Sequence, residues 1–328
     1  MTTFTDLTAT GRGYVTRAQF IDSGYRDRDI RAGVSAGIIV RIRHGVYADA
    51  AAFAQLSPEQ QHVLIGRSVV DKLGPGVALS HQSACAVHDL AMFGHDLHRI
   101  HVTRLDGSAG RNEHGLVHHV GRVLPDDDLV EVDGMLVVRP SRAVFEAATV
   151  GSVESAIVVM DSALHDRAVT REELAELGVQ MWNWQGARRA RYALSLADGR
   201  SESPGESRSR YLFRRKQLPL PDLQVEIFDE NGILVGRSDF GWLEHRHLGE
   251  FDGRVKFGGI PGDARSPQQI AFEEKKREDA LRRQLLGMSR LVWFDLSPAQ
   301  EDRTAARVRA ELEQSRRLYT RDRVVIPL

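Results

Sequence analysis

The expected fold depends most on one part of the chain, Ser238-Asp239-Phe240-Gly241-Trp242 followed by Gly249-Glu250-Phe251-Asp252-Gly253-Arg254-Val255-Lys256. Its pattern predicts two short strands joined by a polar connection. Side chains on a strand alternate between its faces, so Glu250 and Asp252 share one face of the second strand. If that face is aligned with the face that carries Asp239 on the first strand, three carboxylates converge.

Carboxylates in a sheet interior need an explanation. Acidic residues are depleted from strands, and burying a charge without a partner is costly. A divalent metal is one reason to gather them, because Mg²⁺ is held by one or two carboxylates together with water and phosphate oxygens. The stretch therefore predicts a Mg²⁺ or Mn²⁺ site with Asp239, Glu250 and Asp252 as ligands.

The elements expected around this stretch have a distinctive order. A helix opens at Ser203-Pro204, Asn231-Gly232 predicts a hairpin turn, and a long helix is expected from Ser266-Pro267. Leu291 to Phe294 follow as a last apolar strand. This order of helix, hairpin, acidic strands, helix and strand resembles the PD-(D/E)xK nuclease fold, in particular the branch related to very-short-patch repair endonucleases. The resemblance implies metal-dependent phosphodiester hydrolysis of DNA.

Five residues are the expected catalytic groups: Glu206, Asp239, Glu250, Asp252 and Lys256. Asp239 and Glu250 would bind the metal, and Glu206 or Asp252 would complete its shell. Both completing residues have a structural alternative. Glu206 fits the capping box Ser203-x-x-Glu206, and Asp252 fits the first position of an Asp-Gly turn.

The nuclease pattern asks for Glu-x-Lys, and this chain has Asp252 at the third position. Lys256, or Lys276 on the following helix, would have to supply the positive charge that supports the transition state. This departure favours a non-catalytic alternative in which the domain only binds. On the same helix Lys275, Lys276 and Arg277 are expected to hold the phosphate backbone, or to form a solvated face.

The first fifty residues predict a winged helix-turn-helix. Thr16 and Gln19 form a capping box that opens one helix, and a second helix runs from about Asp27 to Ala36, with Gly37 as its C-terminal stop. A basic hairpin follows. In such modules the second helix enters the major groove and the wing touches the DNA backbone. The expected DNA-binding residues are Arg28 and Arg31 on the second helix and Arg41 and Arg43 in the wing.

The middle of the chain alternates helix and strand signals. Helices are expected from Ser57, Ser80 and Pro140, and strands near residues 100–103 and 116–120. Eight of the thirteen histidines lie between residues 81 and 119. They lack Cys partners and the His-Glu-x-x-His spacing of a zincin. We therefore expect ordinary core and surface histidines, and no catalytic metal in this part.

The first 195 residues also resemble a known family. The resemblance rests on Gly13-Tyr14-Val15-Thr16 through Gly45-Val46-Tyr47, on Leu79-Ser80-His81-Gln82-Ser83-Ala84, and on Val132-Asp133-Gly134 with Arg139-Pro140-Ser141-Arg142. These segments are similar to AbiEi-type antitoxins of type IV toxin–antitoxin systems. The resemblance implies a winged helix bound to promoter DNA, a middle domain for antitoxicity or partner contact, and a separate nucleotidyltransferase-like toxin as partner.

Composition sets wider limits. The hydrophobic content of 42% is ordinary for a soluble protein, and a single cysteine, Cys85, excludes an internal disulfide. No run of eighteen apolar residues and no basic-then-apolar leader is present, so we expect a cytoplasmic protein with no membrane partner. The net charge of −1 gives no support for nucleic-acid binding by the whole molecule, so such binding would have to come from local patches.

Together these features predict a multidomain α/β protein of 328 residues. Residues 1–50 would form the winged helix, 51–196 a mixed α+β AbiEi-like domain, and 197–328 a restriction-endonuclease-like α/β domain with a central mixed sheet. The expected function is binding of double-stranded DNA with metal-dependent cleavage or nicking in phage defence. The alternative is a non-catalytic AbiEi-type antitoxin and transcriptional autorepressor.

Overall fold

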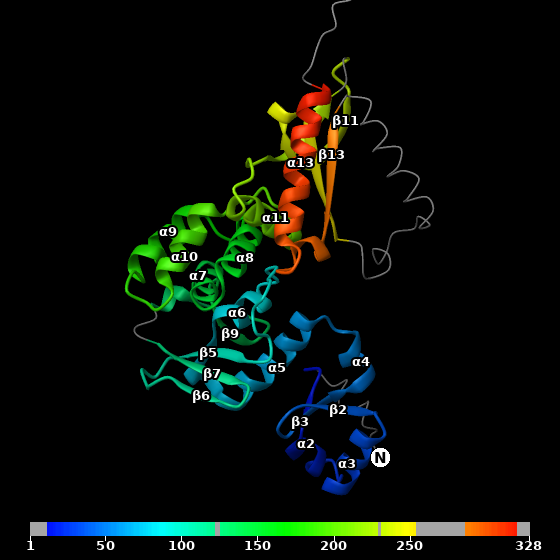
Figure 1. The fold of residues 1–328 in the computed structure, drawn as a ribbon. Coiled ribbons are helices and arrows are strands. Elements are labelled where there is room, and N and C mark those ends of the chain that lie inside the picture. Colours follow the sequence, from blue (N-terminus) through cyan, green and yellow to red (C-terminus); the bar gives the residue numbers. More distant parts are fainter. Residues whose placement is uncertain (1–11, 122–124, 229–230, 254–285, 320–328) are drawn as a thin grey trace, which may run out of the picture. The chain divides into compact units, whose positions relative to one another are not determined.

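The structure is a computed structural model that describes residues 12–121, 125–228, 231–253 and 286–319. The chain forms two compact units (Figure 1). The first comprises residues 1–159 and 168–194, and the second residues 160–167 and 195–328. Lys256, Lys275, Lys276 and Arg277, and the helix expected from Ser266, lie outside the described residues.

The first unit begins with a helix-turn-helix and a hairpin. Their elements are β1 (Val15–Thr16), α2 (Arg17–Asp22), α3 (Asp27–Ser35), β2 (Ile39–Arg43) and β3 (Val46–Asp49). The strands form a three-stranded sheet in the order β1-β3-β2. Thr16 and Gln19 form the expected capping box at the start of α2. Phe20, Tyr25 and Ile30 pack together in the core, which fixes α3 against α2.

The rest of the first unit is built on a six-stranded mixed sheet. The strands are β4 (Val77–Leu79), β5 (Ile100–Arg104), β6 (Arg111–Glu113), β7 (Leu116–Val120), β8 (Leu129–Val132) and β9 (Met135–Val138), in the order β6-β7-β5-β4-β9-β8. The helices are α4 (Ala50–Gln55), α5 (Pro58–Leu73), α6 (His81–Val87), α7 (Pro140–Val150), α8 (Val153–His165), α9 (Arg171–Gln180) and α10 (Ala187–Leu196), and the C-terminal ends of α8 and α10 belong to the second unit. The pairs β5–β7 and β4–β9 are parallel.

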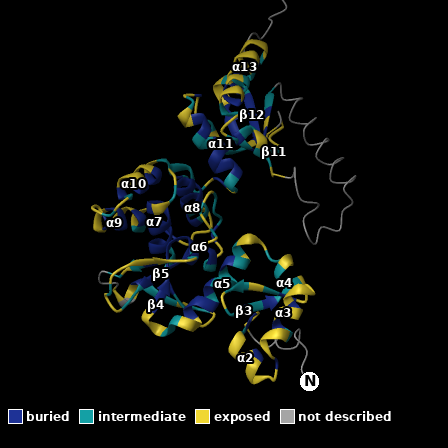
Figure 2. Cartoon of the chain, turned by 60° about the horizontal axis from the view of Figure 1, so that its bottom comes forward, coloured by how far each residue is buried: buried dark blue, intermediate teal, exposed yellow. Residues whose placement is uncertain are grey.

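Helix α7 lies deep in this unit. Residues Ser141 to Thr149 are all buried, and Figure 2 shows α7 largely in the buried colour, whereas α3 is largely exposed. Two of the buried residues are charged. Arg142 donates from Nε to Glu146 at 2.8 Å and pairs with Asp128. The buried charges of this helix are therefore paired with opposite charges.

The second unit is a four-stranded mixed sheet with helices packed on it. Its described elements are α11 (Pro204–Arg215), β10 (Asp222–Phe228), β11 (Leu234–Trp242), β12 (His247–Asp252), β13 (Gly287–Val292) and α13 (Glu301–Tyr319). The strand order is β10-β11-β12-β13, antiparallel except for the parallel pair β12–β13. Phe213, Phe240 and Trp242 form the centre of the core with residues of α13, which lies against β13 (Figure 1).

Three sequence expectations need correction here. The second hairpin strand at Ile233 and the strand at Ser238–Trp242 are one continuous strand, β11. The last strand ends at Val292, because Asp295 accepts its N–H at 3.0 Å and starts a 3₁₀ turn that leaves Phe294 67% exposed. Helix α10 was not expected from the sequence.

Candidate nucleic-acid interface and carboxylate site

The first candidate surface is the outer side of α3. Ile30 and Gly33 are the buried residues of this helix, so Arg28 and Arg31 lie on the opposite, exposed side. The Arg28 side chain is 70% exposed, and its Nε lies 3.5 Å from the carboxylate of Asp29. Asp27, which would oppose this positive charge, is held by Arg17 through two hydrogen bonds of 2.7 and 2.6 Å. The helix therefore presents two accessible guanidinium groups to solvent.

The two wing arginines lie in different environments. Arg41 is exposed on β2. Arg43 donates from Nη1 to the backbone carbonyl of Ser68 on α5 at 3.0 Å, and burial lowers its pKa from the ordinary value. Arg43 therefore connects the hairpin to α5, and only Arg41 of this pair projects freely from the strand.

The predicted carboxylates lie on β11 and β12. Phe240 pairs with Gly249 in the antiparallel register, so one residue further along Asp239 lies opposite Glu250 and on the same face. The Phe251 N–H donates to Asp239 Oδ2 at 2.8 Å. Asp252, half-buried at the end of β12, shares the face of Glu250. The expected alignment of the acidic faces is thus present in the described strands.

Electrostatics show which acids influence one another. The pKa of Asp239 is raised to about 6, chiefly by burial; the hydrogen bond from the Phe251 N–H lowers it, and the charges of Glu206 and Glu250 contribute to the rise. Glu250, 8% exposed, lies 3.5 Å from the guanidinium of Arg290, its neighbour on β13. In the described part of the chain, no three of these carboxylates have ligand oxygens within 4.8 Å of one another.

Glu206 has polar partners at both of its oxygens. Ser203 Oγ donates to Oε1 at 2.7 Å, and Oε2 accepts from Glu202 N at 3.0 Å and Gln224 Nε2 at 2.8 Å. Ser203 also caps the helix by accepting from Glu206 N. The expected capping box is therefore half formed, because the carboxylate takes the N–H of residue 202 instead of that of residue 203.

A cluster of three histidines, His81, His101 and His119, is the feature that sequence reasoning missed. They come from the start of α6, from β5 and from β7, and their ligand nitrogens lie within 4.8 Å of one another. His119 Nε2 is 2.9 Å from His101 Nδ1, and the His81 ring stacks on His119 with centroids 3.7 Å apart. His101 and His119 lie on one face of the sheet, because β5 and β7 pair in parallel.

These imidazoles are neutral at neutral pH. Burial is the main cause that lowers the pKa of His101 to about 3 and that of His119 to about 4, and the neighbouring histidines add to it. Burial also lowers the pKa of His81. The carboxylate of Glu146 lies 3.3 Å from His81 Nδ1, and burial raises the pKa of that carboxyl.

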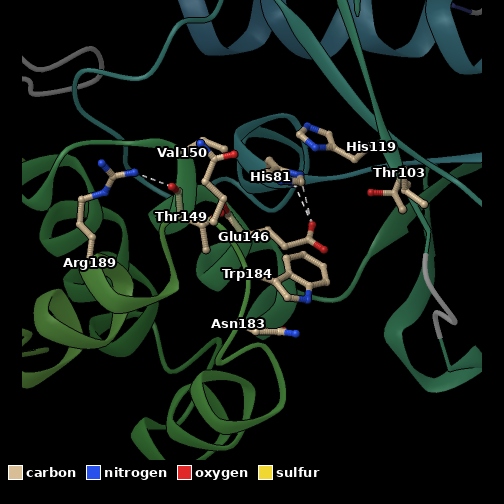
Figure 3. A pocket seen from close by; sticks show the side chains of 11 residues that line it. His81, Thr103, His119, Glu146, Thr149, Val150, Asn183, Trp184 and Arg189 are labelled. Atoms are coloured by element: carbon tan, nitrogen blue, oxygen red, sulfur yellow. Dashed lines mark hydrogen bonds and ion pairs between the residues drawn. The ribbon is translucent and has the colours of Figure 1, made fainter. Parts of the chain in front are cut away.

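The cluster forms part of the wall of a cavity of about 740 Å³. His81, His119, Thr103 and Glu146 lie on its wall, as Figure 3 shows. The other lining residues are Val120, Thr149, Val150, Asn183, Trp184, Gln185 and Arg189. A polar site with room for a small ligand therefore lies within the first unit.

Comparisons with known proteins agree with part of this picture. Residues 5–48 match the model of a family described as "Transcriptional regulator, AbiEi antitoxin". Two proteins of Mycobacterium tuberculosis, "Uncharacterized protein MT2308" from strain CDC 1551 and "Uncharacterized protein Rv2248" from strain H37Rv, are each 30% identical over 223 residues, which are 67% of this chain and 75% of theirs. None of the helices in the described residues is both long and apolar enough to cross a bilayer.

One solved structure is also similar, the crystal structure of the RV2827C protein from Mycobacterium tuberculosis. It covers 67% of this chain and 85% of its own, with 16% sequence identity and a TM-score of 0.36. At this TM-score the likeness supports no inference about the fold or the site.

Proposed function

We propose that this chain, which belongs to one family with the two mycobacterial proteins, is a DNA-binding transcriptional regulator of the AbiEi-antitoxin type. One observation carries the proposal. The segment that matches the regulator family folds as a helix-turn-helix with a hairpin, and its second helix turns Arg28 and Arg31 outward. Such a helix can enter the major groove, where arginine reads guanine through two hydrogen bonds.

We propose different roles for the four expected arginines. Arg28 and Arg31 would face the groove from α3, and Arg41 would contact phosphate from the wing. Arg43 would act indirectly, since its guanidinium is held by the Ser68 carbonyl. These arginines would give the module a local basic patch, which is compatible with DNA binding by a chain whose net charge is −1.

The test is binding of the full chain to the DNA upstream of its own gene, followed by fluorescence anisotropy at several salt concentrations. Arg28→Ala should cost about 1–3 kcal/mol and relax sequence preference, whereas Arg41→Ala should weaken all sequences alike and reduce the salt slope by about 1. Arg188→Ala, an exposed charge of equal sign on α10, is the matched control. Unchanged affinity and selectivity in a variant lacking both Arg28 and Arg31 guanidinium groups would contradict the proposal.

A nucleotidyltransferase-like toxin is the partner that we propose for the antitoxin function. The support is the family resemblance of residues 5–48. Co-expression with the neighbouring gene is the direct test. If that gene encodes a growth inhibitor, co-expression of this chain should restore growth, and a chain without residues 51–196 should restore it less. Equal growth with and without this chain would contradict the assignment.

A second function is favoured by the carboxylates of the second unit. The charges of Glu206 on α11 and Glu250 on β12 contribute to the raised pKa of Asp239 on β11. Asp239 and Glu250 fit a hard divalent ion, because two carboxylates with water suffice for Mg²⁺. Bound there, Mg²⁺ or Mn²⁺ would stabilise charge on a phosphodiester. Glu206, held by three donors, would act through its charge.

Cleavage can be tested apart from regulation. The measurement is Mn²⁺ calorimetry together with plasmid nicking, for the unaltered chain, Glu250→Gln and Lys256→Ala. We expect Glu250→Gln to lose metal and cleavage, and Lys256→Ala to lose cleavage while keeping the metal. A chain that binds its promoter but takes up no Mn²⁺ and cuts no DNA would leave the regulator as the remaining function.

A further inference from the structure

We infer that His81, His101 and His119 bind a divalent transition metal, with Zn²⁺ as the ion that suits their chemistry, in the wall of the cavity within the first unit. Three imidazole nitrogens within 4.8 Å of one another form the ligand set. Imidazole suits zinc, copper, iron and nickel better than it suits magnesium or calcium. The site is separate from the winged helix and from the carboxylates of the second unit, so it stands independently of both proposed functions.

The sheet brings two of the ligands together. In the parallel register Thr103 pairs with His119, so His101, Thr103 and His119 share one face of β5 and β7. His119 Nε2 and His101 Nδ1 are 2.9 Å apart. Two nitrogens bound to one zinc ion at about 2.0–2.1 Å in tetrahedral geometry lie roughly 3.3 Å apart. If the two nitrogens moved apart by a few tenths of an ångström, a zinc ion could therefore take the place of the proton between them.

The third ligand is oriented by its surroundings. His81 Nδ1 lies 3.0 Å from Ser80 Oγ and 3.3 Å from Glu146 Oε2, which leaves Nε2 as the atom for a metal. A carboxylate behind a ligating histidine fixes its tautomer and raises its basicity. Glu146 is itself held by Arg142 at 2.8 Å. The dashed line in Figure 3 marks the pair of His81 and Glu146.

The backbone at His81 supports a special role for this side chain. Its φ is 52°, in the left-handed region that non-glycine residues rarely adopt. The residue is 3% exposed, so the strained conformation is held by the surrounding structure. Such strain is concentrated at ligand-binding and catalytic positions. Here it directs the imidazole at the start of α6 onto the ring of His119.

The cavity determines what else the ion would bind. Three histidines leave the fourth position of a tetrahedral zinc ion open, and zinc sites with an open position bind water or substrate there. Because His81 and His119 line a cavity of about 740 Å³, water can reach the ion from that side. We therefore expect three protein ligands and one exchangeable water.

The test is metal binding by the full chain after treatment with a chelator. Zinc titration by calorimetry should give one tight equivalent, and Co²⁺ in its place should give the strong visible absorption of a four-coordinate site. Glu146→Gln, which alters only the partner of the ligand His81, should lower zinc affinity about 10- to 100-fold. His101→Gln and His119→Gln each remove a ligand and should lower it by more than about 100-fold. His114→Gln, at an exposed histidine between β6 and β7, should bind zinc as the unaltered chain does.

Three outcomes would overturn the inference. One is an unaltered chain that takes up no zinc and shows no Co²⁺ spectrum. Another is equal affinity in His101→Gln, His119→Gln and the unaltered chain. The third is loss of binding in Glu250→Gln alone, which would place the ion on the carboxylates. If circular dichroism shows that the glutamine variants are unfolded, the Co²⁺ spectrum of the unaltered chain decides, since surface histidines and carboxylates give weak six-coordinate absorption.

Discussion

Replacing Asp239 by Asn should stabilise the protein at neutral and alkaline pH. The carboxyl is half-buried on β11, opposite Glu250, and its pKa is raised to about 6 by burial and by the charges of Glu206 and Glu250. Asn has the same shape and no charge, and its carbonyl oxygen can keep the hydrogen bond from the Phe251 N–H. The substitution therefore removes a repulsive charge and preserves the local packing.

The direction and size of the change in stability follow from protonation of this carboxyl in the folded and in the unfolded chain. The folded chain holds this proton more tightly than the unfolded chain, so stability is lost as the pH rises from about 4 through 6. A pKa of about 6 against the ordinary 3.8 corresponds to roughly 3 kcal/mol, at about 1.36 kcal/mol per pKa unit. Because the side chain is only half-buried, solvent screening reduces this to about 1–2 kcal/mol.

The assay is denaturant unfolding of the full chain, followed by circular dichroism at pH 4, 6 and 8. Asp239→Asn should exceed the unaltered chain by about 1–2 kcal/mol at pH 8, by less at pH 6 and by nearly nothing at pH 4. Asp222→Asn, at an exposed position of the neighbouring strand β10, is the matched control and should show no such pH dependence. Equal or lower stability of Asp239→Asn at pH 8 would refute the reasoning, since it would mean that the native structure already compensates the charge.

Three further substitutions test the packing that supports the sites. Phe20→Ala removes a fully buried ring from the helix-turn-helix core and should cost about 3–5 kcal/mol together with DNA binding, as measured by thermal unfolding and anisotropy. Gly205→Ala would place its Cβ 1.9 Å from Phe251, so circular dichroism should show the second unit unfolded. Gly76→Ala has nothing within 4 Å of the added carbon and should leave the stability nearly unchanged. Arg142→Ala leaves buried Glu146 without its arginine and Asp128 with Arg139 alone and should cost about 3–5 kcal/mol in denaturant, whereas a loss below about 1 kcal/mol would show that Glu146 is already neutral.

Local signals in the sequence were read correctly. Thr16 with Gln19, and Thr170 with Glu173, form the capping boxes that their spacing predicts. Asp133 and Gly134 both have positive φ in the turn between β8 and β9. In each case the contact joins residues a few positions apart, so the side chains that make it are visible within one short window.

Contacts between distant segments could not be read in this way. His101 and His119 meet because β5 and β7 pair in parallel, and no pattern within either strand specifies that partner. Arg43 looks like a DNA contact within the hairpin, but its partner is the Ser68 carbonyl, twenty-five positions away. The alignment of Asp239 with Glu250 could be predicted from the sequence, because a short connection restricts two neighbouring strands to antiparallel pairing.

The acids of the second unit bear on which function this unit serves. A half-buried carboxyl with a raised pKa opposes folding at neutral pH, so its charge has to be compensated by a proton, by a cationic side chain or by a metal. Arg290, 3.5 Å from Glu250, compensates one acid, and the donors around Glu206 stabilise another. Within the described residues Asp239 accepts from one backbone donor, the Phe251 N–H, and the net effect of its surroundings still raises its pKa. The least compensated charge is therefore at Asp239. If the unit binds metal, Mn²⁺ should stabilise the unit through that residue. If the unit is kept only as a scaffold, the Asn substitution should stabilise it and Mn²⁺ should not.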